Sequence, residues 1–293
     1  MKNRTKKMDV ASIICCAFLT IYSVVMILLF LWAFLNSLKT KWDFRLNIFG
    51  LPKEWMWSNY KTVVSEFYVN VKSGYGYRDV YTFEMLVNTL LYGVGSAFIS
   101  AFVPCMVAYV VAKYKFRFLK IYYVIVIVTM VLPLIGLTSS ELNLAIKLGL
   151  YDSIPGIWVM RAHFLSMYFL VFYASFKQIP DSFKEAAEID GSSNWKIFAV
   201  ISLPIIKGMF FTVVLLMFVG YWNDYSVALI YLPSHPTLAV GLWRFSISTN
   251  KASLSSVPMQ LAGCMYLFVP IFVIFLIFHD KFMGNISIGG LKE

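Results

Sequence analysis

Residues 179–208 read IPDSFKEAAEIDGSSNWKIFAVISLPIIKG, an amphipathic and fairly polar segment between two strongly apolar runs. Pro180 interrupts the preceding run, and Ser182 three residues before Glu185 has the spacing of a capping box. Gly191 is placed to end the first helix in a left-handed conformation. The segment therefore begins with a short helix that has its own start and stop signals.

A second helix is predicted directly after that turn. Ser193 or Asn194 can cap its first turn with a side-chain oxygen. It is expected to stop near Leu203, because Pro204 follows and disfavours a helical residue before it. The whole segment is thus predicted to be a helix–turn–helix.

The first of these helices has two different faces. Phe183, Ala186 and Ala187 share one face at helical spacing, while Lys184, Glu188 and Asp190 keep the remainder polar. Something other than lipid must cover the apolar face, so we interpret the segment as a docking element for a partner. The alternative is an ordinary amphipathic loop that lies on lipid headgroups.

The composition is that of an integral membrane protein. Mean hydropathy is +0.73, and 60% of the 293 residues are hydrophobic while 14% are charged. Soluble domains have about a quarter charged residues. The net charge of +10 therefore indicates topology and not nucleic-acid binding. Four cysteines fall in apolar runs without metal-ligand spacing, and we expect buried, unpaired thiols at Cys15, Cys16, Cys105 and Cys264.

The hydropathy pattern predicts an all-α transmembrane domain over residues 10–280, with an N-terminal arm (1–9) and a tail (281–293). Two long outer loops cover residues 39–84 and 233–258, and the docking segment forms the inner loop 177–207. A Pro-kinked third span and Arg161 and His163 early in the fourth are the irregular features. Six spans are predicted, at 10–38, 85–112, 121–140, 156–176, 209–232 and 259–278.

Basic residues give the orientation. The N-terminal arm, the turn after the second span and the docking loop each carry four Lys or Arg, whereas the outer connection after the third span carries only Lys147. Positive charge favours the cytoplasmic side. Both termini and the docking loop are therefore predicted to face the cytoplasm, where ATP is available.

No set of residues suggests catalysis in this chain. It has no G-x-x-x-x-G-K-[ST] sequence, so it lacks the loop that cradles ATP phosphates. His163, His235 and His279 are far apart and form no ligand pair. We therefore predict no catalytic residue and no metal site, and energy must come from a separate polypeptide or an ion gradient.

A few polar residues lie inside the predicted spans. Arg161 is expected to extend toward the interface, and Asp224 to make a polar contact with a neighbouring helix. Asn88 and Asn223 could line a polar pathway. Small polar side chains also hold helices together, so both roles stay open for each asparagine.

The docking segment resembles a known signature. Glu185-Ala186-Ala187, then Gly191, and after nine intervening residues Ile201-x-Leu203-Pro204, are similar to the EAA signature of permease subunits of ATP-binding-cassette (ABC) importers. In that family the loop is a cytoplasmic coupling helix that sits in a cleft of the ATPase subunit. The resemblance implies that six residues couple this chain to an ATPase, namely Phe183, Glu185, Ala186, Ala187, Gly191 and Trp195.

Weaker matches extend the resemblance over nearly the whole chain, to the shorter permease subunit of the maltose-type carbohydrate group. They are the stretches 51–60, 88–90, 222–225 and 237–242. The resemblance implies a six-span type I bundle. It also implies that the last stretch reaches toward an extracytoplasmic binding protein, with contacts at Gly241, Leu242 and Trp243.

The implied function is the permease subunit of an importer for a sugar or oligosaccharide in a prokaryotic plasma membrane. Its partners would be a second permease chain, two ATPase subunits that hold ATP and magnesium, and the solute-binding protein, with no cofactor in this chain. Three alternatives remain: a permease for peptides or amino acids, a gradient-driven carrier that works alone, and a membrane enzyme.

Overall fold

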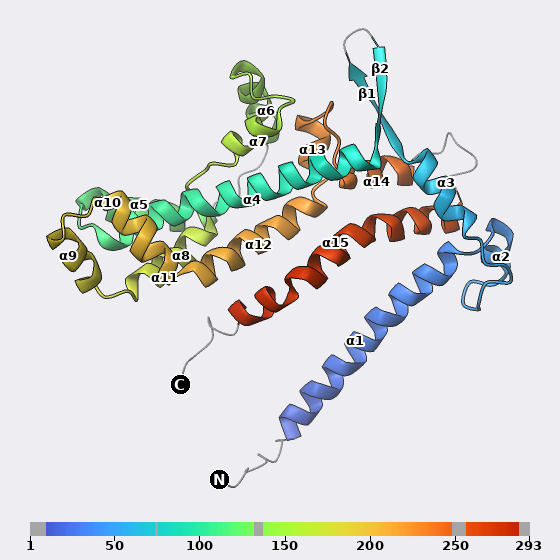
Figure 1. Ribbon diagram of the computed structural model, residues 1–293, viewed down its shortest axis with the longest axis horizontal. Helices are drawn as coiled ribbons and strands as arrows, with labels where there is room; N and C mark the ends of the chain where they lie inside the picture. Colours follow the sequence, from blue (N-terminus) through green and yellow to red (C-terminus); the bar gives the residue numbers. More distant parts are fainter. Residues whose placement is uncertain (1–9, 74–75, 132–136, 248–255, 287–293) are drawn as a thin grey trace. The chain divides into compact units, whose positions relative to one another are not determined.

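The computed structural model describes residues 10–73, 76–131, 137–247 and 256–286. Helices dominate the chain, as the sequence predicts, and Figure 1 shows their order. The chain forms two compact units. One comprises Met1–Phe67 with Arg244–Ile271, and the other comprises Tyr68–Trp243 with Phe272–Glu293.

The first unit is built on α1 (Val10–Ser37) and the first part of α15 (Val257–Ile286). The rings of Phe30 and Phe268 lie 4.8 Å apart. Phe67 contributes a second aromatic contact, 5.3 Å from Phe245. These large apolar side chains supply the packing of this unit.

Two short helices, α2 (Lys41–Leu46) and α3 (Ser58–Glu66), follow α1 in the predicted outer loop. The Asn59 amide donates to the backbone oxygens of Ser37 (2.8 Å) and Lys39 (3.0 Å). The buried Lys39 ammonium donates to the Asn47 oxygen at 2.5 Å. Buried polar groups need such partners, so this part of the loop is a folded element.

The second unit is organised around α4 (Thr82–Lys113), which packs along α8 (Met167–Lys177) and α12 (Lys207–Asn223), as Figure 1 shows. At 1.5 Å per residue, its 32 residues extend about 48 Å, more than a bilayer's hydrocarbon core of about 30 Å. Small buried residues such as Ala101 and Ala108 let its neighbours approach closely. The core of the unit contains Phe169, Phe172, Phe176, Phe198 and Phe210.

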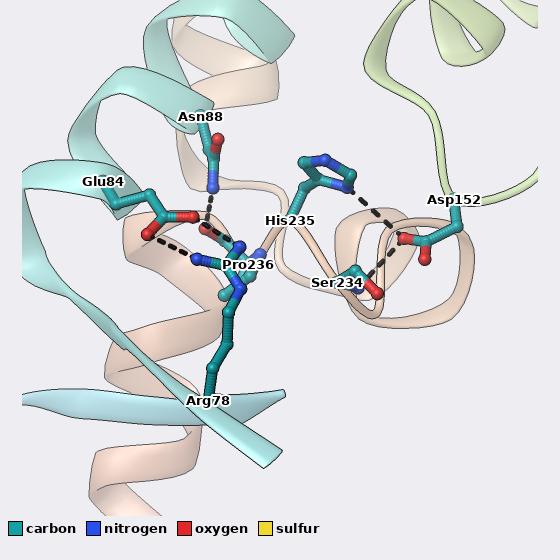
Figure 2. A network of polar contacts seen from close by, with 7 residues as sticks. All are labelled: Arg78, Glu84, Asn88, Asp152, Ser234, His235 and Pro236. Carbon is teal, nitrogen blue, oxygen red and sulfur yellow. Dashed lines mark hydrogen bonds and ion pairs between the residues drawn. The ribbon is translucent and has the colours of Figure 1, made fainter. Parts of the chain in front are cut away.

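A β-hairpin precedes α4 and is absent from the sequence-based expectation. Strands β1 (Tyr68–Ser73) and β2 (Gly76–Tyr81) pair antiparallel, with Val69 opposite Val80. In Figure 2, Arg78 on β2 makes two hydrogen bonds to Glu84 on α4, at 2.9 and 2.7 Å. This bidentate pair fixes the hairpin to the start of the long helix.

The predicted spans agree with the structure to different degrees. Helices α1, α4 and Val257–Ile277 of α15 are each long and apolar enough to cross a membrane. The third predicted span corresponds to α5 (Arg117–Val131) and the start of α6 (Leu137–Lys147), while residues 132–136 lie outside the described part.

The fourth predicted span is wrong as a continuous helix. It divides into α7 (Ile154–Met160) and α8, which begins after its cap Ser166. Arg161 ends α7, and its charged side chain finds its partner on another helix. The break between α7 and α8 therefore coincides with a charged residue whose partner lies elsewhere in the fold.

The predicted stop near Leu203 is close but not correct. The chain continues from α10 (Asn194–Lys196) through a π-helix, η1 (Ile197–Ser202), into α11 (Leu203–Ile205). Pro204 therefore lies inside a continuous helix, directly after a π-helical turn in which the regular backbone bonding is already interrupted. The break comes at Ile206, where the helix axis turns by 81° into α12.

After α12 the chain forms two further short helices, α13 (Ser226–Tyr231) and α14 (Leu238–Ile247). The fifth predicted span (209–232) is interrupted at Asp224 and Tyr225, because α12 ends at Asn223 and α13 begins at Ser226. The cysteine prediction is partly wrong. All four thiols are free, but only Cys105 is buried, while Cys15, Cys16 and Cys264 are exposed on helix surfaces.

Candidate functional site

The first helix of the docking segment is α9 (Ser182–Ile189), which begins one residue earlier than a cap at Ser182 predicts. The predicted capping box is wrong, because Asp181 occupies the N-cap position and no side chain caps the helix. Asp181 has helical dihedral angles, and its carboxylate accepts a hydrogen bond from Lys113 instead of capping α9. Backbone bonds from Lys184 and Glu185 to the Asp181 oxygen begin the helix.

A buried lysine holds the start of α9. The ammonium of Lys113, the last residue of α4, donates to the Ile179 backbone oxygen and to the Asp181 carboxylate, the latter at 2.8 Å. The Lys113 side chain is 4% exposed and that of Asp181 60%. The hydrogen bond from Lys113 holds the pKa of Asp181 below its usual 3.8. The docking helix is thus attached to the end of the central helix.

The end of α9 matches the sequence prediction. Gly191 adopts φ +75°, and the Gly191 and Ser192 N–H groups donate to the Glu188 and Ala187 oxygens, at 3.0 and 2.9 Å. These two bonds make a Schellman motif, which satisfies the last carbonyls of a helix. The turn therefore depends on a left-handed residue at position 191.

The exposed face of α9 carries large apolar side chains that would be unfavourable in contact with water alone. Phe183 is 52% exposed and Ile189 86% exposed, and Ala186 is exposed beside them. Ala187 lies on the opposite side, 6% exposed. Phe183, Ala186 and Ile189 are therefore available to a partner, while Ala187 packs inside the chain.

The two glutamates of α9 differ in their surroundings. Glu188 pairs with Lys184 at 3.3 Å, and the Lys184 ammonium lies over the Tyr114 ring, 4.2 Å from its centre. Glu185 is exposed and makes no side-chain hydrogen bond or ion pair with the described residues. Its carboxylate is free for a basic group from outside the chain.

The second helix of the segment connects the docking surface to the core. Ser193 caps it by accepting from Lys196 N at 3.4 Å, one of the two caps predicted. Trp195 is 58% exposed and packs against Phe198 with a ring distance of 5.5 Å. Phe198 is buried against Tyr109 of α4 and Phe176 of α8. Trp195 also lines an apolar hollow of about 290 Å³ with Tyr109.

A cluster of polar side chains lies within the helices of the second unit. The Asp224 carboxylate accepts a hydrogen bond from Tyr92 of α4 at 2.9 Å, which confirms the predicted contact to a neighbouring helix. Arg161 lies 3.8 Å from the same carboxylate and stacks over Tyr221, 5.2 Å from the ring centre. Arg161 thus turns into the chain, and the expected extension toward the interface is wrong.

The two asparagines predicted as pathway residues lie in different settings. Asn88 is buried, and its amide donates to the Pro236 oxygen at 3.2 Å, as Figure 2 shows. Asn223 is exposed at the end of α12 and donates to its own helix at Val219 O, 2.9 Å away. Their roles along a pathway stay predictions.

The segment predicted to meet a binding protein is part of α14. Gly241 is buried and bonds to the Thr237 oxygen at 2.9 Å, and Leu242 is half-buried. The Trp243 ring stacks on Tyr225 at 5.9 Å. Nearby, Asp152 accepts from Ser234 N at 2.9 Å and contacts the His235 ring (Figure 2), which fixes the loop before α14.

Two residues of the docking site were not singled out from the sequence. The sequence pattern does not mark Ile189, although it lies six residues after Phe183, near the end of the same helix. In the sequence Lys113 is only one positive charge among four, because its partners on the loop are 66 and 68 residues away. Over the described ranges, no group of His, Cys, Asp and Glu is arranged to hold a metal ion.

Curated relatives of this chain are transport permeases. It is 21% identical over 279 residues to the diacetylchitobiose uptake system permease protein NgcG of Streptomyces coelicolor, covering 94% of this chain and 87% of the relative. It is 28% identical over 285 residues to the probable starch degradation products transport system permease protein AmyC of Thermoanaerobacterium thermosulfurigenes, covering 94% and 96%. These relatives indicate a transport subunit and point away from catalysis.

The fold is also that of a solved transporter chain. A bacterial ABC transporter involved in the import of the acidic polysaccharide alginate contains a chain with a TM-score of 0.73 and 21% identity, covering 96% of this chain and 99% of that one. The predicted fold class is therefore confirmed. Residues 100–283 match the family model described as binding-protein-dependent transport system inner membrane component, and the chain belongs to this family of inner-membrane transport proteins that work with an ATPase and a solute-binding protein.

Proposed function

We propose that the chain is a permease subunit of an ABC importer for a sugar or oligosaccharide. It forms half of the translocation pathway with a second permease chain. Two ATPase subunits, which hold the ATP and magnesium, drive it from the cytoplasmic side, where both termini also lie. An extracytoplasmic binding protein delivers the substrate near Gly241, Leu242 and Trp243.

The observation that carries this proposal is the surface of α9. It presents exposed apolar side chains, Phe183 and Ile189, beside the carboxylate of Glu185, which has no partner among the described residues. An apolar patch with a free charge is the composition of an interface that packs its core and fixes its orientation through a polar contact. The EAA-like sequence lies on this surface, which supports its assignment as the coupling helix.

The attachment of α9 explains how movement would reach the membrane domain. Lys113 connects the start of α9 to α4, and Phe198 connects the following helix to the same core. A displacement of the docking segment by an ATPase would therefore move α4 together with α8 and α12, which pack along it. Alternating access requires that kind of concerted movement of packed elements.

The sugar class rests on the relatives. Both curated relatives are named for the transport of saccharides, diacetylchitobiose in one and starch degradation products in the other. Peptide or amino-acid import and a gradient-driven carrier are the competing functions. A carrier that works alone has no need of an exposed docking helix with an unpaired carboxylate.

Purification from native membranes in mild detergent tests the coupling step. Native chain is expected to retain an ATPase with a nucleotide-binding loop, and Glu185→Ala is expected to lose it. Glu188→Ala is the matched control, because it removes a carboxylate from the same helix whose partner, Lys184, lies within the chain. Recovery of the chain alone in every case would contradict the proposal.

Uptake measurements test the substrate class. Cells that carry the complete transporter are supplied with labelled disaccharides and trisaccharides, a labelled dipeptide and a labelled amino acid. ATP-dependent uptake of a saccharide that disappears in Glu185→Ala is expected. Uptake of the dipeptide or the amino acid alone would overturn the sugar assignment while leaving the coupling role intact.

A further inference from the structure

A second, basic hollow lies close to the docking segment but is separate from its exposed face. It encloses about 540 Å³ and is lined from the end of α4, the start of α5 and the end of α8. Four of its lining side chains are cationic: Lys115, Arg117, Lys120 and Lys177. All four are exposed. We call this site the basic hollow.

No acidic residue lines the basic hollow. Over the part of the chain that the structure describes, none of its four cations forms an ion pair. The carboxylate of Asp181 is near enough to be influenced by Lys115 and Lys177, but its hydrogen-bonded partner is Lys113. Four like charges around one hollow repel one another, so binding of an anion among them would be favourable.

The helix that forms one wall adds to this positive potential. Helix α5 begins at Arg117, so the positive end of its dipole lies at the hollow. Cations are unfavourable at a helix N-terminus, yet Arg117 and Lys120 both fall in the first turn. A basic side chain there is understandable when a ligand anion binds between it and the backbone.

The remaining wall is aromatic and apolar. Tyr123 and Tyr173 line it with their rings 5.0 Å apart, and the Lys177 ammonium lies 5.7 Å from the centre of the Tyr173 ring. Tyrosine and lysine side chains in this arrangement are typical of the level where lipid headgroups meet the hydrocarbon. The hollow therefore has the composition expected at the depth of a phospholipid phosphate.

An apolar stripe leads away from the hollow along α5. Ile121, Val124, Ile125 and Val128 are exposed at helical spacing (i, i+3, i+4, i+7), and Val124 also lines the hollow. A soluble phosphate would use the cations and leave this stripe uncovered. A phospholipid would place its phosphate over the cations and an acyl chain along the stripe.

From this arrangement we propose that the basic hollow binds the headgroup of an anionic phospholipid, with Lys115, Arg117, Lys120 and Lys177 around the phosphate and one acyl chain along α5. Polybasic sites at the ends of membrane helices bind acidic lipids in this way. Because Lys113 and Lys115 are only two residues apart, a bound lipid would also neutralise charge next to the contact between Lys113 and Asp181 that attaches α9 to α4.

The test is lipid retention by the full chain in its transporter complex, measured by native mass spectrometry after addition of phosphatidylglycerol or phosphatidylcholine. The native protein is expected to retain phosphatidylglycerol selectively. Arg117→Gln/Lys120→Gln should retain it about thirtyfold less, since each basic residue near the headgroups strengthens binding roughly fivefold. Lys61→Gln/Lys147→Gln, which removes the same charge outside the hollow, should behave as the native protein.

Further variants and measurements distinguish a bound lipid from a soluble anion or a protein partner in the basic hollow. Arg117→Lys/Lys120→Arg keeps the charge and should retain lipid, which covers the case in which the neutral variant fails to fold. Displacement of phosphatidylglycerol by inorganic phosphate at equal concentration would make the hollow a soluble-anion site. Unchanged lipid retention in the neutral variant, with loss of the co-purifying ATPase, would make it a protein interface; either result overturns the proposal.

Discussion

The ammonium of Lys113 lies 2.8 Å from the carboxylate of Asp181 and connects the last residue of α4 to the cap of α9. The lysine is buried and the aspartate is mostly exposed, so the stem of Lys113 belongs to the core while its charge points to the loop. A short exposed helix alone is marginal in water. This anchor gives α9 a fixed position from which it can transmit a movement.

Replacing Lys113 tests the anchor. Lys113→Met removes the charge and leaves the Asp181 carboxylate and the Ile179 oxygen without their donor. We expect the free energy of unfolding to fall by about 1 kcal/mol. A charged hydrogen bond in a fully buried site contributes more than this, but the exposure of Asp181 reduces the contribution here. Hydrogen exchange should become faster in α9, and stimulation of the ATPase by substrate should fall.

Lys196→Gln is the control for that change. Lys196 is exposed in the same segment, and its side chain has no ion pair with any described residue. The Lys196→Gln substitution removes one positive charge but leaves the contact between Lys113 and Asp181 in place. Hydrogen exchange in α9 should therefore stay at the native rate. Equal effects of the two variants would mean that loop charge, and not the attachment to α4, determines the order of α9.

Gly191 gives a graded test of the turn. An added Cβ would meet no atom within 4 Å at this residue, so a substitution acts only through its φ of +75°. Gly191→Ala should cost about 1–2 kcal/mol, Gly191→Asn less because asparagine tolerates this conformation, and Gly191→Pro the most because its φ is fixed. ATPase stimulation in the assembled transporter should decline in that order. Equal activity of the alanine and proline variants would contradict the need for a left-handed turn.

Ile189 is expected to lie in the partner interface. Burial of its side chain by an ATPase would contribute about 1.5–3 kcal/mol, so Ile189→Ser should weaken association with the ATPase about tenfold or more. Titration of the purified ATPase onto the permease complex measures this affinity. Leu216→Ser, an exposed apolar position on α12, should leave it unchanged, and an unchanged affinity in Ile189→Ser would place the interface elsewhere.

Local signals in the sequence were sufficient to predict the end of α9 and the start of the helix that follows it. Gly191 ends α9 and Ser193 caps the next helix because both act within a few residues of their own positions. Long apolar runs likewise predicted α1, α4 and α15. The capping box failed because the pattern at Ser182 and Glu185 could not show that Lys113, far away in sequence, engages Asp181.

Long-range contacts account for the other differences. The fourth span breaks where Arg161 meets Asp224, and 63 positions separate these two residues along the chain. The β-hairpin has an alternating pattern at Val69 and Val71, but its aromatic and polar neighbours hid it within a long loop. The sequence pattern also could not predict which side chains of α9 are exposed. It placed Ala187 on the same face as Phe183, although only Phe183 is exposed.

The anchor of α9 should resist mild acid. Hydrogen bonding by Lys113 holds the pKa of Asp181 below 3.8. A lowered pKa in the folded state stabilises the fold above the ordinary pKa, and this contribution is lost as the pH falls through the lowered value. Exchange protection of α9 should therefore be constant from neutral pH down to about 4 and should fall only below it, whereas Asp181→Asn should show no such fall. Loss of protection near neutral pH would mean that another group controls the loop.

Asp224 is the position at which we expect the largest effect on stability. Its two carboxylate oxygens accept from Tyr92 and from the Val227 backbone, and they face Arg161 at 3.8 Å. Tyr92→Phe removes one hydrogen bond, about 1 kcal/mol. Asp224→Asn also leaves the partly buried arginine without a counter-charge, so it should cost about 3 kcal/mol, measured by thermal unfolding of the assembled transporter.

The pairing itself is tested by a double-mutant cycle. If Arg161 and Asp224 stabilise one another, Arg161→Gln/Asp224→Asn should lose less stability than the sum of the two single variants, because neither charge is then left alone. Simple additivity would mean that Arg161 is held mainly by its stacking on Tyr221. In that case the break between α7 and α8 would arise from the aromatic contact, since a cationic group over a ring face is attractive without a carboxylate.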